Sequence, residues 1–144
     1  MNNEPILKQL AAEIRLRLSD ENPIKGALYT TVAEAKEEQH TYAVLQTAKT
    51  QAKEIVPGNY TWRYPCRLWA VFYPPEDERY TADAFNAWME EAALALVAAC
   101  AALLEGKYNT WTPLDATVTG PLQWAASDAG GYEGSIPFSL VIQF

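Results

Sequence analysis

The chain has little of what metal-binding and catalytic proteins commonly use. Among its 144 residues there is one histidine, His40, and there are two cysteines, Cys66 and Cys100. A single imidazole with no nearby histidine or cysteine makes a poor metal site. Each cysteine has apolar neighbours, which favours reduced, buried thiols over a disulfide or a zinc site. We therefore expect no bound metal and no other cofactor.

Basic residues are also scarce. The chain has 11 lysines and arginines against 18 aspartates and glutamates, giving a formal net charge of −7 and a pI near 4.7. A phosphate-binding surface requires clustered cations, so we expect no sequence-specific binding of nucleic acid. The first residues, MNNEPILKQL, lack the basic start and apolar centre of a secretory signal, so we expect a cytoplasmic protein.

The sequence also lacks catalytic motifs. Its glycine-rich run, Gly130–Gly134, contains no lysine and precedes a strand pattern, so a hairpin loop explains it better than a phosphate cradle. The carboxylates of Glu76, Asp77 and Glu78 fall in a short charged connector rather than in a pocket pattern. No serine or cysteine stands in a nucleophile-elbow context. We therefore expect that the protein is not an enzyme.

The clearest element that the sequence does contain is a long helix from Thr81 to Gly106. Thr81 is a suitable N-cap, and Gly106 is suited to a left-handed residue just past the helix end. From Ala92 to Leu104 no side chain is polar, but Glu90, Glu91 and Glu105 leave this run shorter than a membrane span, so we expect no membrane partner. Ten residues at helical spacing predict one buried face: Phe85, Trp88, Met89, Ala92, Ala93, Leu96, Val97, Cys100, Leu103 and Leu104.

The rest of the chain predicts one further helix and four strands. An amphipathic helix is expected over Glu4–Leu18. Leu28 to Val32 is compatible with a short strand, but Thr31 and Glu34 resemble a capping box, and we favour a short helix or loop over Val32–Gln39. Alternating and β-rich segments predict strands over Tyr42–Ala48, Tyr60–Tyr73, Asp115–Thr119 and Ser135–Phe144, with Ser127–Gly134 as a long tip between the last two.

Two of these strands define sheet faces. In Tyr60–Tyr73 one face carries Tyr64, Cys66, Leu68 and Phe72, the other carries Trp69 and Tyr73 among others, and Pro65 predicts an edge, bulge or break. The last strand alternates most regularly, so its apolar side chains should share one buried face: Ile136, Phe138, Leu140, Ile142 and Phe144.

These elements predict a single α+β domain over residues 1–144, with an antiparallel-rich sheet and both helices packed on one of its faces. One helix layer and one sheet do not easily cover a helix that is apolar all round and a strand that is apolar on both faces. We therefore expect self-association, and the candidate subunit-interface residues are Ala95, Ala98, Ala102, Ile55, Val56, Trp62, Trp69 and Tyr73.

The order of elements resembles the tail-terminator, or tail-completion, proteins and related minor tail or neck proteins of long-tailed phages. The resemblance is carried by Tyr42–Leu45, by Ile55–Asn59 leading into Tyr60–Trp62, and by the alternating strand Ser135–Phe144. It implies a structural protein that assembles as a homo-oligomeric ring, with a hexamer as the size to test, and that contacts other tail or head-connector proteins. It also implies a location in the cytoplasm during assembly and in the virion if a phage encodes the chain.

A second hypothesis follows from the aromatic residues alone. A small cytosolic, oligomeric binding module could use the tryptophans and tyrosines of Tyr60–Tyr73 as a surface for a ligand or a peptide. The two hypotheses differ in the mass they predict in solution, because a ring requires several copies.

Overall fold

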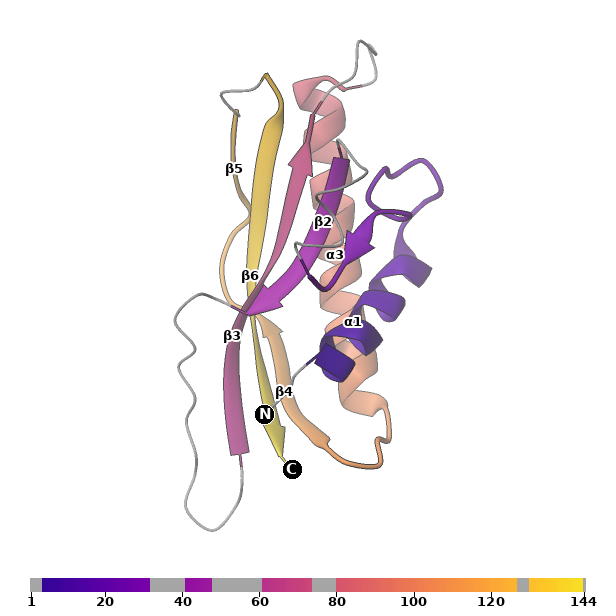
Figure 1. The fold of residues 1–144 in the computed structure, drawn as a ribbon, viewed down its shortest axis with the longest axis vertical. Coiled ribbons are helices and arrows are strands. Elements are labelled where there is room, and N and C mark those ends of the chain that lie inside the picture. Colours follow the sequence, from indigo (N-terminus) through magenta and orange to yellow (C-terminus); the bar gives the residue numbers. More distant parts are fainter. Residues whose placement is uncertain (1–3, 32–40, 48–60, 74–79, 127–129, 144) are drawn as a thin grey trace.

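The computed structural model of the chain describes residues 4–31, 41–47, 61–73, 80–126 and 130–143. In these residues two helices lie beside one six-stranded sheet, and both are to the right of the β3–β6 pair in Figure 1. The elements are α1 (Glu4–Arg17), β1 (Leu28–Tyr29), β2 (Thr41–Thr47), β3 (Thr61–Phe72), α3 (Ala82–Glu105), β4 (Thr112–Val118), β5 (Gln123–Ala126) and β6 (Tyr132–Gln143). The predicted α+β class is confirmed.

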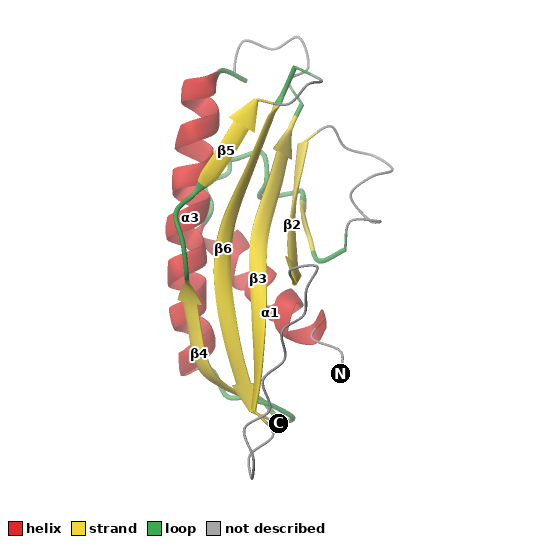
Figure 2. Ribbon diagram, turned by 90° about the vertical axis from the view of Figure 1, so that its left-hand side faces the viewer, coloured by secondary structure: helices red, strands yellow, loops and turns green. Residues whose placement is uncertain are grey.

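The sheet has the order β1-β2-β3-β6-β4, with β5 also paired to β6. Only β1 and β2 run parallel among these pairs, so the predicted antiparallel-rich sheet is confirmed. The long strands β3 and β6 form its centre, with Thr61 opposite Gln143 at one end and Phe72 opposite Tyr132 at the other. Figure 2 shows β5 and β4 along the upper and lower parts of this pair.

Two prolines lie in the central strands at positions where, among the described residues, a neighbouring ladder ends. The described pairing of β2 with β3 ends at Cys66, so Pro65 has a paired strand, β6, on one side only. Pro137 of β6 lies between the stretch paired with β5 and the stretch paired with β4. A proline cannot donate to a ladder, and both positions reduce that cost. Residues 48–60, which follow β2, lie outside the described residues, so the edge, bulge or break expected at Pro65 stays a prediction.

The core lies between the helices and the inner sheet face. Ile136, Phe138, Leu140 and Ile142 of β6 are all buried there, as their alternation predicts, while Phe144 is outside the described residues. At one end Phe72 and Phe85 meet edge to face, with centroids 5.0 Å apart. Gly134 allows this approach, because a Cβ at that position would lie 3.1 Å from the Phe85 ring.

Helix α3 begins after Thr81 and ends before Gly106, as predicted, but Gly106 is needed there for a different reason. The Thr81 hydroxyl accepts a hydrogen bond from the backbone N–H of Ala84 at 3.2 Å. Gly106 is extended, with φ of −76°, so the expected left-handed conformation is wrong. A Cβ on Gly106 would instead lie 2.6 Å from Cζ of Tyr108, whose ring stacks on Trp111 at 3.8 Å. The glycine therefore makes room for an aromatic side chain.

A polar cluster joins the end of α1 to the middle of α3. The Glu91 carboxylate accepts hydrogen bonds from the Ser19 backbone N–H at 2.8 Å and from the Asn22 amide at 3.2 Å. Asn22 is buried and also donates to the Trp88 carbonyl at 3.1 Å. This connection holds the two helices together on one face of the sheet.

The shorter segments compare with the predictions in different ways. The short strand β1 is present at Leu28–Tyr29, whereas Val32–Gln39 lies outside the described residues. Strand β6 begins at Tyr132 rather than Ser135, so part of the expected tip belongs to the hairpin formed with β5. Strand β5 was not predicted, because its four residues are all exposed and leave no alternation to detect.

Candidate functional site

The first candidate surface is an apolar stripe on the outer side of α3. We call Leu94, Val97, Ala101 and Leu104 the outer stripe; all four are exposed, with 73% of Leu94, 53% of Val97 and 39% of Leu104 accessible. They are spaced three and four residues apart, which places them in one line along the helix. Sequence analysis assigned Val97 and Leu104 to the buried face, and this assignment is wrong.

Three of the four residues of the outer stripe form one wall of a groove between α3 and β4, and Leu94 continues the stripe beyond it. Val97, Ala101 and Leu104 face Ala116, Thr117 and Val118 across a hollow of about 330 Å³, with Cys100 also in its lining. Strand β4 is short and bulged, with a register shift between Pro113 and Asp115. The groove therefore lies where the sheet ends and one side of the helix stays uncovered by described residues.

The charged side chains around this groove are mainly acidic. Helix α3 contains Asp83, Glu90, Glu91 and Glu105 but no lysine or arginine. Glu90 and Glu105 are exposed near the two ends of the outer stripe. On the β4 side Asp115 accepts a hydrogen bond from Thr117, and its charge adds to the burial that raises the pKa of Cys100 to about 11. The next basic residue is Lys107, beyond the helix end.

The three alanines predicted at the subunit interface are placed differently by the fold. Ala95 is only 3% accessible and belongs to the core, so its assignment to an interface is wrong. Ala98 and Ala102 are half-buried and lie beside the outer stripe. The error has a physical cause: a helix with no polar side chain gives no indication of which side faces the sheet.

The second candidate surface is the sheet face opposite the helices, here called the outer sheet face. Ala27, Tyr42, Val44 and Val71 form a small buried cluster there, with Tyr29, Trp69 and Tyr73 packed against it. Tyr42 and Trp69 meet edge to face at 5.8 Å. Part of this face is therefore covered within the chain, and self-association through the rest stays a prediction.

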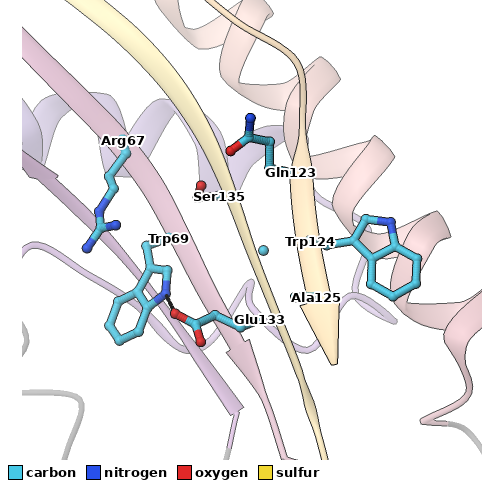
Figure 3. Close-up of a pocket in the computed structure, with 8 residues that line it drawn as sticks. Arg67, Trp69, Gln123, Trp124, Ala125, Glu133 and Ser135 are labelled. Carbon is cyan, nitrogen blue, oxygen red and sulfur yellow. Dashed lines mark hydrogen bonds between the residues drawn. The ribbon is translucent and has the colours of Figure 1, made fainter. Parts of the chain in front are cut away.

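A hollow of about 330 Å³ opens beside Trp69 on this face. Figure 3 shows the Trp69 indole donating to the Glu133 carboxylate, with the Arg67 guanidinium nearby. Arg67 lies 5.6 Å from the centre of the Trp69 ring, a cation–π arrangement. The hollow exists because Ser135, Gly134 and Ala125 are small next to these long side chains.

Strand β5 forms the other border of this hollow. Its residue Trp124 points away from Trp69 in Figure 3 and packs edge to face on Phe85 at 5.4 Å. All four β5 residues are exposed, and β6 is its only partner among the described strands. The polar and aromatic side chains around the Trp69 hollow could accept an extended peptide or a planar ligand.

The other five predicted interface residues lie in or next to β3 and in the segment before it. Trp69 and Tyr73 lie half-buried on the outer sheet face, as expected. Trp62 is half-buried but packs against the main core, so it lies on the helix side of the sheet. Ile55 and Val56 lie outside the described residues.

The thiols are free and buried, as predicted. Burial raises the pKa of Cys66 to about 12 and is the main cause of the raised pKa of Cys100. Within the described residues no group of three or more histidine, cysteine or carboxylate side chains could hold a metal ion. His40 and the Glu76–Glu78 carboxylates lie outside these residues.

By length and composition alone, α3 could cross a membrane. The helix has 24 residues, so the short apolar run Ala92–Leu104 does not by itself exclude a membrane span. The core helix of a soluble protein meets the same description, and eight residues of α3 are buried in this fold. This property is therefore weak evidence of a membrane partner, and the expected absence of one stays a prediction.

Comparison with known proteins adds no family assignment. A scan against protein-family models and a search of curated proteins found no match. The function is therefore argued from the two surfaces described above.

Proposed function

We propose that this protein is a structural assembly subunit of a phage or prophage tail or neck, as a ring-forming tail terminator or a head–tail joining component, without catalysis. The observation that carries the proposal is the presence of two separate hollowed surfaces, the α3–β4 groove beside the helix and the Trp69 hollow on the outer sheet face, each of which can contact a neighbour. A subunit within an assembly contacts more than one neighbour, whereas a simple binding module needs one surface.

Two other properties support this proposal. The resemblance implies an antiparallel-rich sheet with helices on one face, and the fold has this arrangement. The formal charge of −7 suits a ring through which DNA passes without being held, since like charges repel.

The mass of the protein in solution tests the proposal. Sedimentation velocity over a range of concentrations should give a closed oligomer, with a hexamer as the form that the resemblance implies. Replacing Trp69, which lies on the outer sheet face, by serine should shift the equilibrium toward monomer if this face joins the copies. A wild-type protein that remains monomeric at high concentration would contradict a ring.

The Trp69 hollow favours a second candidate function, that of a small binding module. Its Arg67 and Glu133 provide opposite charges on either side of an aromatic ring, as expected of a site that orients a ligand. A monomer whose tryptophan fluorescence responds to a bound peptide, with the response lost in Trp69→Phe, would support this function over the assembly role.

A further inference from the structure

The α3–β4 groove and its surrounding charges also indicate which kind of molecule binds there. Helix recognition in a groove uses apolar anchors spaced three and four residues apart on both partners. The outer stripe has this spacing, and the hollow beside it provides space for the anchors of a second helix. The shape of the site thus matches an amphipathic helix rather than a small polar ligand.

The charges argue against a second α3 as this helix. Pairing two copies in parallel would place Glu90 beside Glu90, and antiparallel pairing would bring Glu90 of one copy to the end that carries Glu105 of the other. Helix α3 has no basic residue that could compensate. Like charges at an interface disfavour the pairing, so acidic ends on both helices select against self-association through this surface.

We infer that the α3–β4 groove binds an amphipathic helix of a different protein, one whose apolar stripe is flanked by lysine or arginine residues. Apolar anchors of that helix enter between Val97 and Val118, and its basic residues meet Glu90, Glu105 and Asp115. The inference rests on the proposed function only in expecting a protein partner, and it leaves contact between copies to the outer sheet face.

A set of three synthetic helical peptides tests the inference by isothermal titration with the full chain. The first has leucines at the stripe positions and lysines on both flanks, the second replaces the lysines by glutamates, and the third replaces the leucines by serines. Only the first should bind, because it alone matches both the apolar and the acidic parts of the groove. If the first and third peptides bind equally, charge attraction alone explains the binding, and the inference is overturned.

Substitutions on the two helices provide a matched control. Leu94 and Leu16 are both leucines with most of their side chain exposed, but Leu94 belongs to the outer stripe and Leu16 to α1. Leu94→Ser and Val97→Ser should each weaken the first peptide at least tenfold, while Leu16→Ser should change its affinity less than twofold. Unchanged thermal melts would show that all three variants fold.

Three further results would overturn the inference: no binding of the first peptide, equal binding by Val97→Ser, or a wild-type oligomer that Val97→Ser converts to monomer. The last result would assign the groove to a second copy and would leave the proposed ring in place. A monomeric wild-type protein that binds the first peptide would contradict the proposed ring but would support the inferred helix-binding role of the groove.

Discussion

Helix α3 and strand β6 are both rich in apolar residues, yet their faces were predicted with different success. In β6, residues that are mostly polar alternate with Ile136, Phe138, Leu140 and Ile142, and these four are buried. In α3, no polar residue interrupts the centre, and Leu94 and Leu96 differ completely in exposure although they are two positions apart. A pattern therefore identifies a face only when the other face is chemically different.

Deleting most of β6, the strand whose buried face was predicted correctly, should have the largest effect on stability. Deleting Ile136 to Phe144 removes four buried side chains, each contributing about 1.5–3 kcal/mol. Their sum is comparable to the whole stability of a small domain, about 5–15 kcal/mol. We expect no cooperative thermal transition by circular dichroism. A truncated protein that melts near the parent temperature would show that β6 contributes less than its burial indicates.

The contrast within α3 is tested by two leucines of opposite burial. Leu96→Ala should lower the free energy of unfolding by about 2–5 kcal/mol, because it leaves a cavity against the sheet. Leu94→Ala should change it by no more than about 0.5 kcal/mol, since this side chain is exposed. Urea denaturation with unchanged slopes measures both. Equal losses would mean that another chain covers Leu94 under the conditions used.

The end of α3 offers a sharper test of why a glycine stands there. Gly106→Ala should destabilise the protein by about 1 kcal/mol, because the new Cβ would displace Tyr108 from Trp111. In a Tyr108→Ala background the same substitution should cost little, since no ring remains to displace. Gly26→Ala is the control, because open space surrounds that position. If Gly106→Ala destabilises the Tyr108→Ala variant by the same amount, the backbone conformation at position 106, not the Tyr108 ring, requires the glycine.

The smallest effect concerns Cys66 on β3 and Cys100 on α3. Their pKa values rise from 9.0 to about 12 and about 11, so both thiols stay protonated in the folded protein when they begin to ionise in the unfolded chain. Their contribution to stability is therefore full below pH 9 and is lost as the pH rises from 9 through 11 to 12. The Cys66→Ala variant should lose less stability over this range than wild type. Identical pH profiles would show that the Cys66 thiol ionises equally in both states.

Much of the fold could be predicted because local signals agreed with burial. The alternation of β6, the N-cap at Thr81 and the spacing of α1 each define an element without knowledge of its neighbours. The glycines predicted a hairpin loop before β6, but its expected partner was the Asp115–Thr119 strand, and β5 was missed because its exposed residues show no alternation. The faces of α3 were predicted least accurately: Ala95, assigned to an interface, is in the core, and Val97, assigned to the buried face, is exposed.

The sequence by itself determined the type of the long elements, the burial of both cysteines and the inner face of β6, whose buried apolar side chains alternate with mostly polar ones. Only the tertiary structure decided which side of α3 faces the sheet, because that choice depends on where β4 and β6 lie and not on the helix alone. It also decided that β4 ends early enough to leave the α3–β4 groove open. Contacts between residues distant in the chain set these features, and no local pattern encodes them.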